Sequence, residues 1–259
     1  MNAHGVEFRV GEFRLGPLDL QGPTNRPWLF LGPSGAGKSL LLQLVSGRLR
    51  PSAGRLVGPR CLYLPQRPES VLVGRNLAED LSGSVRPAAV ERSRLRDALA
   101  RTGVPGVPLS ARSRGLSAGR RRLLALTLIS LAPAEAWALD EPDAGLDRAA
   151  CRKVQEVLRS VIDDGKMIYL ASHRPAIYAA LDPWVIVLDR GRLVATGSWC
   201  DIVSNANCCR LLGLNQAPAL RTWQLLGHPL GELLPGSSTP EFGPNARLKR
   251  AIARKIGVS

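Results

Sequence analysis

Short apolar runs alternate with longer amphipathic stretches along most of the chain. The apolar runs end at polar or turn residues, which predicts buried β-strands over Trp28–Leu31, Arg60–Leu64, Ala136–Leu139 and Met167–Ala171. The longer stretches predict helices over Ser39–Ser46, Asn76–Thr102, Ser117–Leu131 and Arg148–Asp164. Strands that alternate with helices favour an α/β fold with a mainly parallel sheet covered on both faces.

A different pattern stands at each end of this alternating region. Weak alternation of apolar residues from Val6 to Leu20 predicts short antiparallel strands before the first buried strand. At the other end, Trp184–Leu188 and Leu193–Ala195 flank the turn Asp189–Arg192, which is typical of a hairpin. We therefore expect an N-terminal antiparallel β subdomain and a closing hairpin.

The composition is that of an ordinary globular protein with an excess of positive charge. Hydrophobic residues make up 45% of the 259 residues and charged residues 22%, and the net charge is +14. That excess favours an anionic partner, which is a nucleotide, a nucleic acid or a membrane surface. Charge alone does not choose among the three.

The chain also shows what kind of compartment to expect. The apolar run Leu123–Ala134 is shorter than the ~20 residues that span a bilayer. The early charged residues Glu7, Arg9 and Glu12 argue against a secretory signal. Five cysteines without metal-ligand spacing are expected to be reduced, with the adjacent Cys208-Cys209 partly buried. We therefore expect a cytosolic protein that can lie against a membrane.

A glycine-rich segment follows the first buried strand. It consists of Gly32, Pro33, Ser34, Gly35, Ala36, Gly37, Lys38 and Ser39. Between a strand and a helix, this spacing is that of a P-loop, whose backbone N–H groups face a polyphosphate. Lys38 is expected to reach the β- and γ-phosphates and the Ser39 hydroxyl to bind Mg²⁺. The start of the helix adds its positive dipole end to the same anion.

Four further polar stretches stand at strand or helix ends. Asp140 is placed to hold Mg²⁺, and the adjacent Glu141 can take a proton from an attacking water. Gln66 offers a neutral amide to both Mg²⁺ and that water, and His173 can hydrogen-bond the γ-phosphate. Leu116–Arg120 opens a helix with small residues and bare N–H groups. Each stretch alone could instead have no catalytic role, because lone histidines are often structural and Asp-Glu pairs are common on surfaces.

Together and in this order, the stretches resemble the ATP-binding cassette (ABC) family over about residues 6–203. They match its P-loop, its Q-loop at Gln66, its signature at Leu116–Arg120, its Walker B run ending at Asp140-Glu141, its D-loop at Ala144–Asp147 and its H-loop at His173. The resemblance implies ATP and Mg²⁺ as ligands, and a dimer in which the P-loop of one cassette faces the signature of a second. Ser117, Ala118 and Gly119 would then contact the ATP of the partner.

Some positions depart from the family pattern or leave a choice open. Ala118 and Arg120 replace the common glycine and glutamine of the signature, and Arg120 could add a cation near the phosphates. The catalytic glutamate and the H-loop histidine are intact, which argues against a cassette that binds ATP without hydrolysing it. The family places an aromatic ring against adenine, and Phe8 or Phe13 could supply it or serve as a core residue instead.

A finer resemblance is to the ATPases of energy-coupling-factor importers, which take up cobalt, nickel and vitamins. Gln66–Val73 and Asn76–Asp80 are similar to their Q-loop region, although Val71 stands where that family has a second glutamine. Segments between Leu211 and Phe242 resemble their C-terminal dimerisation element, with an ordinary surface segment as the alternative. The basic amphipathic stretch Ala246–Ile256 predicts a helix that touches anionic lipid or packs on its own domain.

We therefore expect a nucleotide-binding domain over residues 1–205, with an inserted helical subdomain at about 76–131, and a small helical C-terminal extension over 206–259. The resemblance implies an ATP-hydrolysing subunit of an energy-coupling-factor importer, peripheral on the cytoplasmic side of the cell membrane. It implies two protein partners, a second ABC ATPase subunit (identical or related) and an integral membrane subunit.

Other functions remain as alternatives. They are a subunit of another ABC transporter class, a regulatory cassette, or a nucleic-acid-associated ABC ATPase. The last is disfavoured because the interval between Lys38 and Ser117 holds no heptads and no cysteine clusters, and because the chain carries one cassette. We expect no nucleic-acid partner.

Overall fold

The computed structural model describes residues 1–67, 71–72, 74–84, 92–102, 104, 107–108 and 110–214. The chain divides into two compact units, one over Met1–Trp199 and one that begins at Cys200, and each is described by itself. Part of the predicted Q-loop match (68–70 and 73), the extension beyond Leu214 and the predicted helix at Ala246–Ile256 lie outside the described residues.

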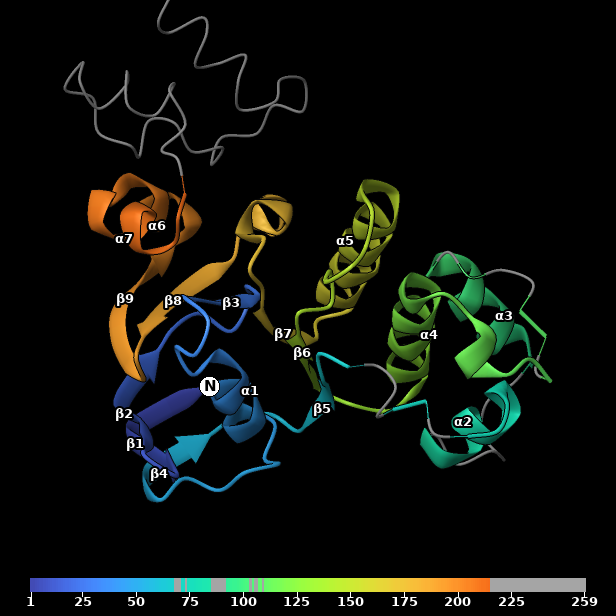
Figure 1. Cartoon of the computed structure of the whole chain (residues 1–259), viewed down its shortest axis with the longest axis horizontal. Helices are drawn as coiled ribbons and strands as arrows, with labels where there is room; N and C mark the ends of the chain where they lie inside the picture. The colour runs from blue at the N-terminus through green and yellow to red at the C-terminus, as the bar shows by residue number, and fades with distance from the viewer. Residues whose placement is uncertain are drawn as a thin grey trace, which may run out of the picture. The chain divides into compact units, whose positions relative to one another are not determined.

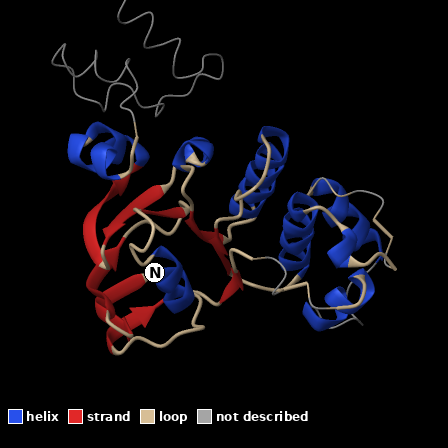
Figure 2. Ribbon diagram, viewed as in Figure 1, coloured by secondary structure: helices blue, strands red, loops and turns tan. Residues whose placement is uncertain are grey.

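A six-stranded sheet organises the first unit (Figures 1 and 2). Its strands are β3 (Trp28–Leu31), β5 (Cys61–Leu64), β6 (Ala136–Asp140), β7 (Met167–Ala171), β8 (Trp184–Asp189) and β9 (Arg192–Ser198). Their order is β5-β6-β7-β3-β8-β9, and every pair is parallel except β8 with β9. This confirms the predicted parallel sheet and closing hairpin. Because the strands are parallel, the segments that follow β3, β5, β6 and β7 leave the sheet at the same edge.

A second, three-stranded antiparallel sheet contains β1 (Asn2–Val10), β2 (Phe13–Gln21) and β4 (Ala53–Val57) in the order β2-β1-β4. It confirms the predicted N-terminal β subdomain. Helix α1 (Lys38–Val45) joins the two sheets, because its Leu41 and Leu42 are buried in one core with Leu18 of β2 and Tyr169 of β7. Burying each leucine contributes about 1.5–3 kcal/mol relative to exposure.

The remaining helices of the first unit are α2 (Leu77–Ser84), α3 (Arg92–Arg101), α4 (Ala118–Leu131) and α5 (Arg148–Asp163), with 3₁₀ turns at Ser113–Gly115, Pro175–Ile177 and Ala179–Leu181. Helices α2 and α3 lie within the helix predicted over Asn76–Thr102, and residues 85–91 between them lie outside the described part. A hydrogen bond of 2.5 Å between the Thr102 and Thr127 hydroxyls joins the end of α3 to α4. Helices α2, α3 and α4 gather in one group in Figure 1.

The described part of the second unit is short. Helix α6 (Trp199–Ser204) begins at the boundary and α7 (Ala206–Leu211) follows it. The Asn205 side chain caps α7 by accepting hydrogen bonds from the amides of Asn207 and Cys208 at 3.0 and 3.1 Å. Within the part of the chain that the structure describes, no helix combines the length and the apolar character that crossing a bilayer requires.

Candidate functional site

The glycine-rich segment lies between β3 and α1, as predicted. Strand β3 is buried along its whole length between β7 and β8, so the segment leaves the sheet at a fixed point. A Cβ at Gly32 would lie 2.1 Å from the Leu188 carbonyl oxygen, and Gly37 precedes α1 with a φ of 101°. Both positions therefore require glycine, because a side chain would collide with the backbone at Gly32 and would disfavour the left-handed conformation at Gly37.

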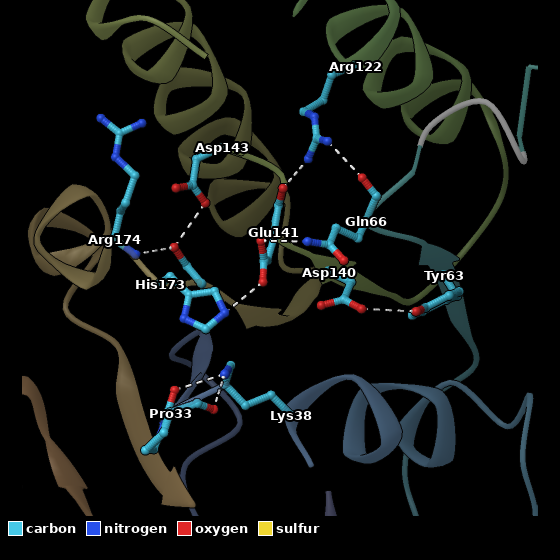
Figure 3. A network of polar contacts seen from close by, with 12 residues as sticks. Pro33, Lys38, Tyr63, Gln66, Arg122, Asp140, Glu141, Asp143, His173 and Arg174 are labelled. Carbon is cyan, nitrogen blue, oxygen red and sulfur yellow. Dashed lines mark hydrogen bonds and ion pairs between the residues drawn. The ribbon is translucent and has the colours of Figure 1, made fainter. Parts of the chain in front are cut away.

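Lys38 begins α1, and only 6% of it is exposed. Its ammonium donates hydrogen bonds to the carbonyl oxygens of Gly32 and Pro33 at 2.8 and 2.9 Å, inside the glycine-rich loop (Figure 3). Burial lowers the pKa of Lys38, while the charges of Glu141 and Asp140 raise it. The loop thus holds the buried amine of Lys38, and the carboxylates of Glu141 and Asp140 favour its charged form.

Asp140, 4% exposed, ends β6 beside the start of α1. Its carboxylate accepts hydrogen bonds from the Ser39 hydroxyl and, at 3.2 Å, from the Tyr63 hydroxyl. Burial raises the pKa of the Asp140 carboxyl, and these two hydrogen bonds and the charge of Lys38 act in the opposite direction. A carboxylate, a hydroxyl and an amide oxygen are the hard oxygen donors that Mg²⁺ prefers, so Asp140, Ser39 and Gln66 fit that ion.

Glu141 meets the two other predicted catalytic side chains (Figure 3). Its carboxylate accepts a hydrogen bond of 2.9 Å from the Gln66 amide, and His173 Nε2 lies 2.9 Å from its other oxygen. Gln66 follows β5, Glu141 follows β6 and His173 follows β7, so adjacent parallel strands bring the three together. The peptide of Glu141 is unusual, because its φ of 50° is rare for a residue with a side chain.

One cavity of about 420 Å³ is lined by Ser34–Leu40 of the P-loop region together with Gln66, Glu141 and His173. Val10 and Phe13 also line it, and Phe8 is absent from the described residues that line it. Both phenylalanines pack against the core. Of the two predicted candidates for contact with adenine, Phe13 is the one that lines this cavity. The cavity is therefore lined by a cation (Lys38), a possible proton acceptor (Glu141) and an aromatic ring (Phe13).

The predicted signature residues lie elsewhere, at the start of α4. The Ser117 side chain caps this helix by accepting a hydrogen bond of 3.3 Å from the Arg120 amide, as predicted. Ala118 and Gly119 form its first turn. Among the described residues that line the 420 Å³ cavity, none comes from Leu116–Arg120. One chain thus holds the P-loop cavity and the signature turn at separate places.

A buried polar network supports the loop that carries His173. The Asp143 carboxylate accepts hydrogen bonds from Ser172 at 2.9 Å and from Tyr178 at 2.8 Å, and all three residues are at most 2% exposed. The Arg174 guanidinium donates to the Leu146 carbonyl in the D-loop stretch at 3.2 Å. The segments after β6 and β7 are therefore tied together next to Glu141.

Tyr178→Phe is expected to lower the free energy of unfolding by about 1.5–3 kcal/mol, because it removes a buried hydrogen bond to a carboxylate. Burial raises the pKa of Tyr178, so its hydroxyl is protonated and donates at neutral pH. Urea titration followed by circular dichroism measures the change. Tyr169→Phe is the matched control, because the Tyr169 hydroxyl is buried with no hydrogen-bond partner among the described residues. Equal losses in both variants would contradict this account.

Two residues of the site were missed by the sequence analysis. Tyr63 on β5 bonds to Asp140, and Arg122 on α4 donates to the backbone carbonyls of Glu141 and Gln66. The sequence gives no signal that singles out Arg122, because it is one of three consecutive arginines, Arg120–Arg122. Tyr63 gives no signal either, since an aromatic residue in a buried strand is ordinary.

The chain is similar to known proteins in sequence and in fold. A sequence model of the ABC transporter family matches residues 15–144. The energy-coupling factor transporter ATP-binding protein EcfA2 of Symbiobacterium thermophilum is 30% identical over 227 residues, which are 80% of this chain and 78% of that protein. A putative ABC transporter ATP-binding protein of Streptomyces coelicolor is 33% identical over 200 residues. That alignment covers 72% of this chain but 35% of the relative, so the chain spans about a third of that protein.

A solved structure shows the same fold. The structure of cbiO1 from Clostridium perfringens, described as part of the ABC transporter complex cbiONQ, superposes with a TM-score of 0.68 at 22% identity. The match covers 88% of this chain and 98% of cbiO1. The fold predicted from the sequence, a P-loop NTPase with a mainly parallel sheet, is thereby confirmed. By its family match and by its similarity to EcfA2, the chain belongs to the ABC transporter family of ATP-binding proteins.

Proposed function

We propose that the chain is the ATP-hydrolysing subunit of a membrane importer of the energy-coupling-factor type. The single observation that carries this proposal is the cavity in which the P-loop residues face Gln66, Glu141 and His173. The relative EcfA2 supports the energy-coupling-factor class, because its own name assigns it to an energy-coupling factor transporter.

Each residue of the site has its own role in phosphoryl transfer in this proposal. The P-loop amides and Lys38 hold the phosphates of ATP, and the Glu141 carboxylate takes the proton of the attacking water. Gln66 and His173, both in contact with that carboxylate, orient the water and the γ-phosphate. Asp140, Ser39 and Gln66 would hold Mg²⁺, which when bound would neutralise negative charge on the phosphates.

The signature turn is proposed to act on a second cassette. Because Ser117, Ala118 and Gly119 lie outside the cavity of their own chain, they are free to complete the ATP site of a partner ABC subunit, identical or related. Residues 1–205 form the nucleotide-binding domain in this proposal, with the helical subdomain at about 76–131, and residues 206–259 form an extension. The dimer would act as a peripheral protein at the cytoplasmic face of the membrane, against an integral membrane subunit.

Isolation of the tagged full chain from its native membranes tests the proposal. We expect an integral membrane subunit and a second ABC subunit to copurify in detergent, and the complex to hydrolyse ATP. Recovery with DNA or RNA that dissociates as salt is raised, together with ATPase stimulation by that nucleic acid, would contradict the importer assignment and support a nucleic-acid-associated ATPase. ATP binding without turnover in the isolated complex would indicate a regulatory cassette.

A further inference from the structure

One guanidinium group lies between the two loops that carry Gln66 and Glu141. Arg122, in the second turn of α4, is 9% exposed. Its Nη1 donates a hydrogen bond to the Glu141 carbonyl oxygen, and its Nη2 donates to the Gln66 carbonyl oxygen at 2.7 Å (Figure 3). The two acceptors follow adjacent strands, β5 and β6, that are far apart in the sequence.

Together with the contact between the Gln66 and Glu141 side chains, these hydrogen bonds form a closed ring that includes Glu141, the proposed proton acceptor. The side chains of Gln66 and Glu141 are joined at 2.9 Å, and their backbone carbonyls are joined through Arg122. A side chain fixed at both its tip and its backbone has little freedom to rotate away. The ring therefore determines where the Glu141 carboxylate stands relative to the cavity.

The Glu141 peptide needs such support. Its φ of 50° is a left-handed conformation that is unfavourable for a residue with a side chain and persists only when neighbours hold it. The Glu141 amide donates to the Ala171 carbonyl at 2.9 Å, and its carbonyl accepts from the Ala144 amide at 3.1 Å as well as from Arg122. Arg122 supplies the one side chain in this set, and it comes from a helix outside the sheet.

That helix also carries the signature turn. Ser117 caps α4, and Arg122 follows one turn later on the same rigid element. In the proposed dimer, the first turn of α4 contacts the ATP of the partner, while Arg122 contacts the loops of its own site. A displacement of α4 would therefore reach Glu141 and Gln66 directly.

We propose that Arg122 is a positioning residue that sets Glu141 and Gln66 for hydrolysis and links them to the signature end of α4, an inference that rests on the proposed ATP hydrolysis at this site. Arginine suits the role because its planar fork presents two parallel donors to two carbonyls. Lysine retains the charge but is a point donor without that fork.

The test compares Arg122→Lys and Arg122→Gln with the unaltered full chain in its isolated complex. For Arg122→Lys we expect the turnover number for ATP to fall about 10- to 100-fold, as for a small misplacement of catalytic groups. The dissociation constant of ATP is expected to change by less than about twofold, because the P-loop and Lys38, which hold the phosphates, are unaltered. Arg122→Gln, which also removes the charge, is expected to lose at least as much turnover. Arg152→Lys, an exposed arginine on α5, is the control and should leave turnover unchanged.

A double-mutant cycle distinguishes positioning from a merely structural role. If Arg122 acts through Glu141, adding Arg122→Lys to Glu141→Gln should lower the residual turnover by less than about twofold. A further loss as large as in the single variant would overturn the proposal, as would wild-type turnover in Arg122→Lys. A joint fall of ATP affinity, turnover and melting temperature, or failure of both variants to fold, would show a role in stability and also overturn it. Failure of the proposed function is separate, because it would appear as absent turnover in the unaltered chain.

Discussion

Glu141→Gln is expected to lower the rate of ATP hydrolysis by about 100- to 10,000-fold while ATP still binds. The glutamine amide has the size of the carboxylate and can still accept the hydrogen bond from Gln66, but it cannot take a proton from water. The P-loop and Lys38 are untouched by this change. Phosphate release at saturating ATP measures the turnover, and titration with a fluorescent ATP analogue measures the affinity.

Glu156→Gln is the control for this prediction. Glu156 is exposed on α5 and pairs only weakly with Lys153 at the surface, so its loss should leave turnover unchanged. Turnover of Glu141→Gln within about threefold of the unaltered chain would contradict the assignment of Glu141 as the proton acceptor.

Lys38→Ala is expected to weaken ATP binding about 10- to 100-fold. The buried ammonium provides charge-assisted hydrogen bonds to phosphate, each worth about 1.5–3 kcal/mol, and 1.4 kcal/mol corresponds to a factor of ten in the dissociation constant. The substitution also leaves the carbonyls of Gly32 and Pro33 without the donor that Lys38 supplies. Isothermal titration with ATP and Mg²⁺ measures the affinity.

Lys153→Ala on the exposed face of α5 controls for the loss of one positive charge. It should leave the affinity unchanged, because an exposed lysine contributes little beyond long-range attraction. An unchanged dissociation constant in Lys38→Ala would count against a P-loop that holds a triphosphate at this position.

The sequence was sufficient for the features that local patterns encode. Buried strands such as β3 and β6 are short apolar runs, and the P-loop is a fixed set of glycines between a strand and a helix. The cap of α4 also follows from one residue, because Ser117 is a good N-cap before a long apolar helix. These elements depend on neighbours in the chain, so their residues can be recognised one stretch at a time.

The strand order and the supporting contacts required the three-dimensional arrangement. β3 lies between β7 and β8, which come more than a hundred residues later in the chain, and no local pattern specifies that order. Arg122 acquires its place only because α4 packs where two strand ends meet. The same holds for the hydrogen bonds of Asp143 with Ser172 and Tyr178, which join segments on either side of α5. Long-range packing decides such contacts, and a single sequence does not display it.

ATP-driven association of the Glu141→Gln chain tests the central claim, which is that the P-loop cavity is completed by the signature turn of a second cassette. Light scattering after size exclusion measures the mass with and without ATP and Mg²⁺. When the partner is an identical chain, the account predicts the mass of two chains with ATP, and of one chain when Ser117→Arg is added to block the signature turn. An ATP-bound chain that keeps the mass of a monomer, and that recruits no second ABC subunit from its native membranes, would contradict it.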